Sequence, residues 1–94
     1  MASNADELTV NWEENGRQVV RELEKRILSK GAWATVIFRY SDWDGRRDDW
    51  GPEKFTIRRY QKRNGEYRQQ SKFNISSRDQ AQSIIEALQG WLKE

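Results

Sequence analysis

One short segment, residues 33–40, constrains the fold more than any other feature, because its side chains are apolar on both faces of a strand. It is rich in β-branched and aromatic residues and too short to form a helix. One face carries Ala34, Val36, Phe38 and Tyr40, and the other carries Trp33, Thr35, Ile37 and Arg39. Such a strand lies in the middle of its sheet and is covered on both sides. The rest of the chain must therefore supply its neighbours and its cover.

The C-terminus carries a second strong pattern. Ser76 and Asp79 have the spacing of a capping box, and Gln80 offers a second one from Ser77. Apolar residues then recur with the period of a helix, at Ala81, Ile84, Ile85, Leu88, Trp91 and Leu92. We predict a helix over residues 77–92. Its apolar stripe is expected to pack on the chain's own sheet, and a two-fold contact between copies is the alternative.

Residues 16–29 predict another helix, with Asn15 as its N-cap and Gly31 as its stop. Five apolar residues recur there at helical spacing among charged ones: Val19, Val20, Leu23, Ile27 and Leu28. Residues 1–14 are expected to be flexible or to add a short edge strand at residues 8–10. Residues 15–94 then form a single domain. A core this small is marginal, so a partner subunit is a natural supplement.

Residues 54–75 predict a β-hairpin around Asn64-Gly65. A two-residue loop would mix apolar side chains with lysine on one face. A three-residue loop sets Phe55 opposite Phe73 and keeps the apolar side chains together, so we favour it. The other face would then be polar and basic, with Lys54, Thr56, Arg58, Tyr60, Lys62, Arg68, Gln70, Lys72 and Asn74.

The composition argues against most enzymes. The 94 residues include no cysteine and no histidine, so thiolate nucleophiles, histidine bases and metal sites built from either residue are excluded. We expect no enzymatic activity, no cofactor, no metal and no small-molecule substrate. An acidic loop resembles a calcium-binding loop only loosely, because its Gly45 stands at the fourth position instead of the sixth.

The sequence shows no membrane or export signal. No apolar run approaches the roughly 18 residues of a membrane helix. The N-terminal residues lack the apolar core of a signal peptide. The expected location is intracellular, in the cytoplasm or associated with the nucleoid.

The charge of the chain is concentrated in one segment. The net charge is +2, but residues 54–78 hold eight basic residues against the single acidic Glu66, a local charge of +7. Such a concentration indicates an anionic partner. Basic side chains neutralise phosphates, and aromatic rings stack on unpaired bases. We therefore predict phosphate contacts by Lys54, Arg58, Lys62, Arg68 and Lys72, and base stacking by Tyr60.

The alternative is that this basic face is an ordinary solvated face of the sheet. The two interpretations differ in what the cations contact. Ion pairs with the nearby carboxylates would weaken the nucleic-acid hypothesis; the cations in question are Arg58, Arg68 and Lys72, and the carboxylates are Asp48, Asp49 and Glu53.

The polar connector over residues 42–53 contains two tryptophans that have little core to enter, Trp43 and Trp50. They are either interaction residues or a lid over the sheet, and for Trp50 the sequence does not decide between these roles. Trp33 and Trp91 lie in apolar patterns and are expected in the core.

Four motifs follow one another between residues 33 and 92. They are Asp42-Trp43-Asp44-Gly45-Arg46, Phe55-Thr56-Ile57-Arg58-Arg59-Tyr60, Asn64-Gly65-Glu66-Tyr67, and Ile75-Ser76 followed by a polar cap and Gln80. Together they resemble the positive-cofactor-four family of single-stranded-DNA-binding transcriptional coactivators, or a divergent relative of it. The resemblance implies a curved antiparallel sheet, a C-terminal helix, and a homodimer whose two sheets form a channel for single strands. It also implies that Trp43 stacks on bases and that Arg58, Tyr60 and Lys72 occupy binding positions.

The predicted fold is α+β: a curved antiparallel β-sheet with a C-terminal helix and an additional N-terminal helix. The predicted function is non-catalytic binding of single-stranded DNA or RNA, as a homodimer with a transcription-related role. The alternative is a small protein–protein interaction module or adaptor that uses the acidic, tryptophan-containing loop 42–53.

Overall fold

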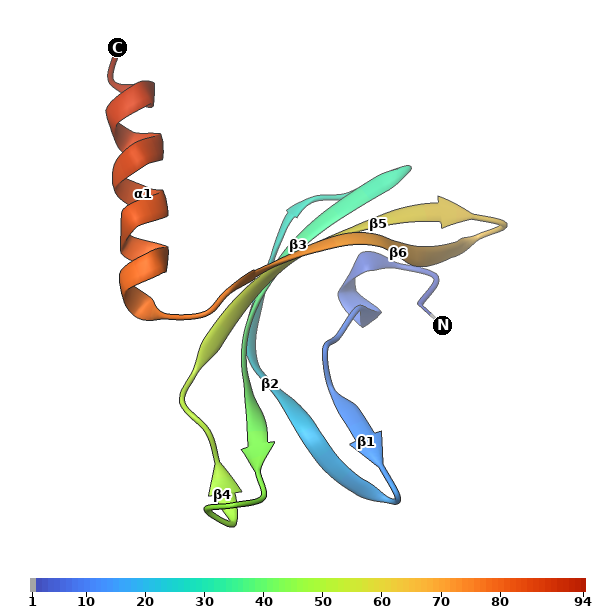
Figure 1. The fold of residues 1–94 in the computed structure, drawn as a ribbon. Helices are drawn as coiled ribbons and strands as arrows, with labels where there is room; N and C mark the ends of the chain where they lie inside the picture. Colours follow the sequence, from blue (N-terminus) through green and yellow to red (C-terminus); the bar gives the residue numbers. More distant parts are fainter. Residues whose placement is uncertain (1) are drawn as a thin grey trace.

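A computed structural model describes residues 2–94 as one curled antiparallel sheet with a C-terminal helix (Figure 1). The strands pair in the order β1-β2-β3-β5-β6, and the short β4 pairs with the end of β3. The α+β class, with its curved antiparallel sheet and C-terminal helix, is confirmed. In chain order the elements are a 3-10 turn Ala5–Glu7, β1 Trp12–Glu14, β2 Arg17–Ser29, β3 Trp33–Asp44, β4 Asp49–Trp50, β5 Lys54–Arg63, β6 Glu66–Ile75 and α1 Arg78–Leu92.

The helix predicted over residues 16–29 is wrong, because this segment is the long strand β2. Asn15 and Gly16 have φ values of 52° and 77°, which make them the tight turn of a β1–β2 hairpin and not a helix cap. The register of β2 against β3 shifts twice, at bulges that insert Leu23 and Leu28. These two extra residues break the alternation of the strand and give its apolar side chains a helix-like spacing.

The three-residue loop predicted for the second hairpin is also wrong. Its turn has two residues, Asn64 and Gly65, again with positive φ values of 52° and 79°. A bulge between Arg59 and Tyr60 in the β5–β6 ladder shifts the register and sets Phe55 opposite Ile75. The bulge, and not the length of the loop, places the apolar and the basic side chains on different faces of the hairpin.

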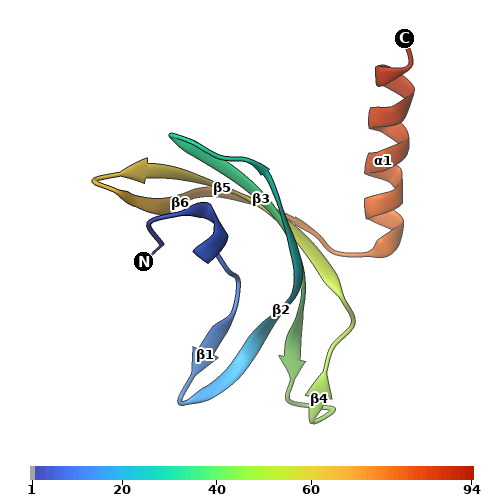
Figure 2. The ribbon, with the colours of Figure 1, turned by 180° about the vertical axis from the view of Figure 1, so that it is seen from behind.

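The core lies on the concave face of the sheet, under the N-terminal segment (Figure 2). Ala5, Leu8 and Val10 are buried there against strand side chains that include Val36 and Phe38. The N-terminal segment is therefore anchored by these three side chains, and its short edge strand lies at Trp12–Glu14 instead of residues 8–10. Met1, part of the segment predicted to be flexible, lies outside the described residues.

Helix α1 stands on the convex side and projects away from the sheet (Figure 1). Its predicted cap is confirmed, since the Ser77 side chain accepts a hydrogen bond from the Gln80 backbone at 3.1 Å. The expected packing on its own sheet is wrong, because the helix has no buried residue. Trp91 is 68% exposed and Trp33 is 39% exposed, so neither is the core residue that its pattern predicted.

Candidate nucleic-acid interface

A groove of about 440 Å³ opens on the concave face between the N-terminal segment and strands β3, β5 and β6. The N-terminal segment covers one part of the concave face and leaves the part that forms this groove open. The groove is lined by Thr9, Val10, Asn11, Trp12, Val20, Tyr40, Asp42, Arg58, Lys72 and Asn74. Two of the predicted phosphate contacts, Arg58 and Lys72, are therefore part of its wall.

Arg58 and Lys72 are opposite each other in the β5–β6 ladder and so share the concave face. Arg58 reaches the side chain of Gln69 at 3.2 Å, while its Nε is buried and has no hydrogen-bond partner. Lys72 is exposed. Within residues 2–94, neither cation forms a salt bridge, so both charges remain available to an anion.

The carboxylates that could have neutralised these cations pair elsewhere. Asp48 lies 4.0 Å from Arg17, and Glu53 binds Arg39 at 3.0 Å and also binds Arg78. The hydrogen bond from Arg39 lowers the pKa of Glu53 below its ordinary value. In the described part of the chain, the basic residues of the hairpin therefore form no ion pairs with Asp48, Asp49 or Glu53. Such ion pairs would have weakened the nucleic-acid hypothesis.

Lys54 stands near the end of the groove, where β5 begins, but it is not a free cation. Its Nζ lies 2.9 Å from a carboxylate oxygen of Asp42, which also lines the groove. The hydrogen bond to Asp42 raises the pKa of Lys54. Because the two charges cancel, this pair adds no net positive charge to the groove.

Tyr60 and Lys62 occupy the same face but the opposite end. Tyr60 is only 5% exposed, and its burial raises the pKa of its phenol. It belongs to the core and cannot stack on a base in this conformation. Lys62 is exposed, and its ammonium lies 5.2 Å from the ring centroid of Tyr67.

Two predicted contacts, Trp43 and Arg68, lie on the other side of the sheet. Side chains alternate along a strand, so Trp43 faces away from Asp42 and Tyr40. Arg68 is paired with Gln61, and both side chains point away from the basic face. The two-residue turn and the bulge cause this shift of one position. The predicted set is therefore divided between the faces.

Trp43 and Trp50 pack on each other at the tip of β3 and β4, edge to face, with ring centroids 5.4 Å apart. Arg17 lies 4.2 Å from the centroid of Trp43, and Arg21 lies 4.4 Å from that of Trp50. Cation–π contacts of this kind hold both rings in the fold. Trp50 is thus a packing residue of this tip.

Trp12 is a potential binding residue that the sequence argument missed. It is 61% exposed, lies on β1 and lines the groove across from the basic wall. The signal that could have found it is the Asn15-Gly16 dipeptide, which is typical of a hairpin turn and would have placed Trp12 on a strand.

No three acidic side chains gather to hold a metal ion among the residues that the structure describes. No described helix has the length and apolar character to cross a membrane. In comparisons with known proteins, no family model, no curated protein and no solved structure matched the chain.

Proposed function

We propose that this protein binds single-stranded nucleic acid without catalysis, in the concave groove of its half-barrel. Arg58 and Lys72 contact phosphates from one wall, and Lys62 extends the positive charge along the same face. Trp12 offers its ring to a base from the opposite wall. In this proposal the protein acts as a homodimer in the cytoplasm or nucleoid, in a transcription-related role.

The observation that carries the proposal is the pair of unneutralised cations facing an exposed aromatic ring across an open groove. A solvated sheet face normally mixes charges of both signs. Here Asp48 and Glu53 bind arginines of other elements and Asp42 binds Lys54, so none of these three carboxylates pairs with Arg58 or Lys72. Phosphate binding and base stacking with little sequence preference need this combination of side chains.

A fluorescence titration with oligo-dT at several salt concentrations tests the proposal. Quenching of tryptophan emission is expected, with binding that weakens as salt rises. Three free cations per chain (Arg58, Lys62 and Lys72) predict a slope of log K against log salt of about −2, at roughly −0.7 per phosphate contact. No binding at low salt, or binding insensitive to salt, would refute the proposal.

The chain offers a matched pair of charge variants on the same hairpin. Lys72→Gln removes a cation from the groove and is expected to weaken binding and reduce the salt slope by about 0.7. Arg68→Gln removes the same charge from the opposite face and is expected to leave both quantities nearly unchanged. Equal effects of the two variants would assign binding to net charge alone and not to the groove.

The competing proposal is a protein-interaction module that uses the acidic loop 42–53. The mutual packing of Trp43 and Trp50 accounts for these side chains without a partner. If oligo-dT binding fails, the loop becomes the surface to test next, with Asp44 and Asp49 as its exposed or half-exposed acidic residues.

A further inference from the structure

The convex side of the molecule carries two apolar surfaces that remain exposed or half-exposed in the part of the chain that the structure describes. One is the stripe of α1, formed by Ile84, Ile85, Leu88, Trp91 and Leu92. The other, which we call the convex patch, consists of the outward side chains of β3, β5 and β6: Trp33, Ile37, Phe55, Ile57 and Phe73. Large exposed apolar surfaces of this kind mark interaction sites.

The exposed area of the chain is larger than the average for a folded monomer of its mass. Its accessible surface is 6940 Å², whereas a folded monomer of 11.2 kDa is expected to expose about 5,700 Å². Its radius of gyration is 15.1 Å, against about 12 Å for a domain of this length. The excess area exceeds the roughly 800 Å² that each partner buries in an interface of standard size.

The helix cannot cover the convex patch of its own chain while its first turn stays where it is. Ser77 caps the helix directly after β6, and Arg78 is tied to Glu53, which also binds Arg39 of β3. From this anchor α1 runs away from the sheet (Figure 1). An open wedge of about 580 Å³ remains between the two, with Phe55 on the sheet and Ile85 on the helix among its lining residues.

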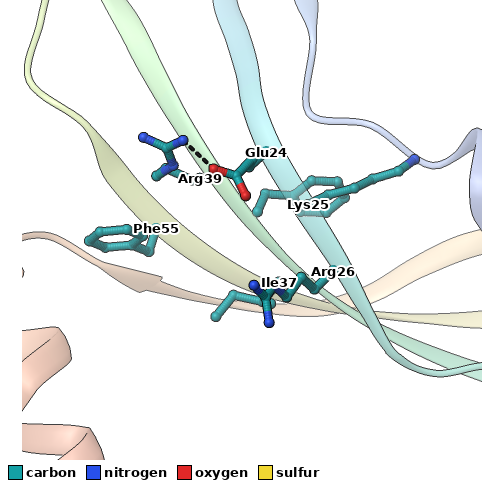
Figure 3. A pocket seen from close by; sticks show the side chains of 7 residues that line it. Glu24, Lys25, Arg26, Ile37, Arg39 and Phe55 are labelled. Carbon is teal, nitrogen blue, oxygen red and sulfur yellow. Dashed lines mark hydrogen bonds and ion pairs between the residues drawn. The ribbon is translucent and has the colours of Figure 1, made fainter.

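The convex patch contains a shallow apolar pocket of about 200 Å³, in which Ile37 and Phe55 are the apolar side chains on the outward face. Figure 3 shows these two side chains with Arg26, while Lys25 extends toward the N-terminal segment. The guanidinium of Arg26 stands at the rim and forms no salt bridge within residues 2–94. Such a pocket suits an aromatic side chain stacked under a cation.

We propose that two copies of this chain associate through their convex sides, with α1 of each copy lying on the convex patch of the other. Trp91 is the anchor that enters the pocket at Ile37 and Phe55. Helix and patch match in length, since 15 helical residues extend about 22 Å and the stretch of β5 from Phe55 to Gln61 extends about 20 Å. A two-fold axis makes both contacts at once, which is how most homodimers are built.

This arrangement places the two concave grooves on opposite outer sides of the dimer and not in one shared channel. The inference builds on the homodimer of the proposed function but not on its nucleic acid. It is therefore tested without nucleic acid, so that a failure of the dimer proposal can be distinguished from a failure of the nucleic-acid proposal.

Sedimentation equilibrium of the full chain gives the first test. The unmodified protein is expected to be a dimer at micromolar concentration, and Trp91→Glu and Phe73→Glu are each expected to make it monomeric. Ser83→Glu adds the same charge on the far face of α1 and is expected to leave the dimer intact. All three substituted residues are exposed, so circular dichroism should report an unchanged sheet in every variant. A monomeric wild type, or dimers that survive both substitutions, would overturn the proposal.

Disulfide trapping tests the geometry, since the chain has no cysteine of its own. A mixture of the single variants Leu88→Cys and Phe73→Cys is expected to give a cross-linked heterodimer under mild oxidation. Ser83→Cys mixed with Phe73→Cys is expected to give little. Cross-linking between two Leu88→Cys chains but none to Phe73→Cys would show a helix–helix dimer instead and refute the helix-on-sheet contact.

Discussion

Lys72 lies directly opposite Arg58 across the β5–β6 ladder, so that two positive charges share one face with no salt-bridge partner inside the described chain. Like charges in this position destabilise a sheet by roughly 0.2–1 kcal/mol. A fold that keeps such a pair gives up stability, as binding sites commonly do.

Lys72→Gln should therefore make the protein more stable while weakening its binding of oligo-dT. Removing the repulsion is expected to raise the midpoint of thermal unfolding by about 1–5 °C for a domain of this size. Thermal unfolding followed by circular dichroism at low salt measures this change. A lowered midpoint would mean that Lys72 is held by a contact that stabilises the fold.

Trp12 and Trp43 should respond oppositely to truncation. Trp12→Ala removes an exposed ring from the groove and is expected to weaken oligo-dT binding about 5-fold or more, because stacking contributes roughly 1–3 kcal/mol per base. Trp43→Ala removes a ring packed on Trp50 and is expected to cost at least about 0.5–1.5 kcal/mol of folding stability, the contribution of the ring pair beyond its buried area, with little loss of affinity. The reverse pattern would assign stacking to Trp43 and remove the groove from the mechanism.

Leu8→Ala should strongly destabilise the protein, because the N-terminal segment forms part of the core. Leu8 is only 6% exposed, and truncating a buried leucine costs about 2–5 kcal/mol. The matched control is Leu28→Ala, at a position that is 57% exposed, where a change within about 0.5 kcal/mol is expected. Urea denaturation of both variants measures the difference. Equal stabilities would show that the segment does not hold the sheet.

Glu53 should make the stability of the protein sensitive to acid. Its folded-state pKa is lowered from 4.5 by Arg39, with Arg78 as a second partner. A lowered pKa contributes stability that is present above pH 4.5 and is lost as the pH falls through the folded-state value. Glu53→Gln should therefore lower the unfolding midpoint at neutral pH, and its difference from the wild type should vanish as the pH falls through the folded-state pKa of Glu53. A difference that persists in acid would contradict an electrostatic origin.

The local patterns of the sequence were sufficient for several elements. The double apolar alternation of residues 33–40 correctly predicted that β3 lies in the middle of the sheet. The expected cover on both faces is wrong, because Trp33 on the convex face is 39% exposed. The capping residue Ser77 and the 3.6-residue period after it predicted α1. These signals are local, so no knowledge of the rest of the chain was needed to use them.

The sequence misled where a bulge interrupts a strand. Leu23 and Leu28 in β2 and the extra residue in β6 change the apolar spacing by one position each. The altered spacing therefore predicted a helix over residues 16–29 and a position for Arg68 on the basic face, and both predictions are wrong. A bulge forms because the partner strand demands a register, and the partner cannot be read from the segment itself.

The sequence by itself determined the charge of the hairpin, the central strand and the amphipathic helix, because composition and periodicity express them directly. Tertiary structure alone decided which charges remain free. Asp48 and Glu53 bind arginines of other elements, Arg58 and Lys72 face a groove, and Trp12 meets them from a strand that the sequence argument had not predicted. These relationships join residues far apart in the chain, and the curl of the sheet brings them together.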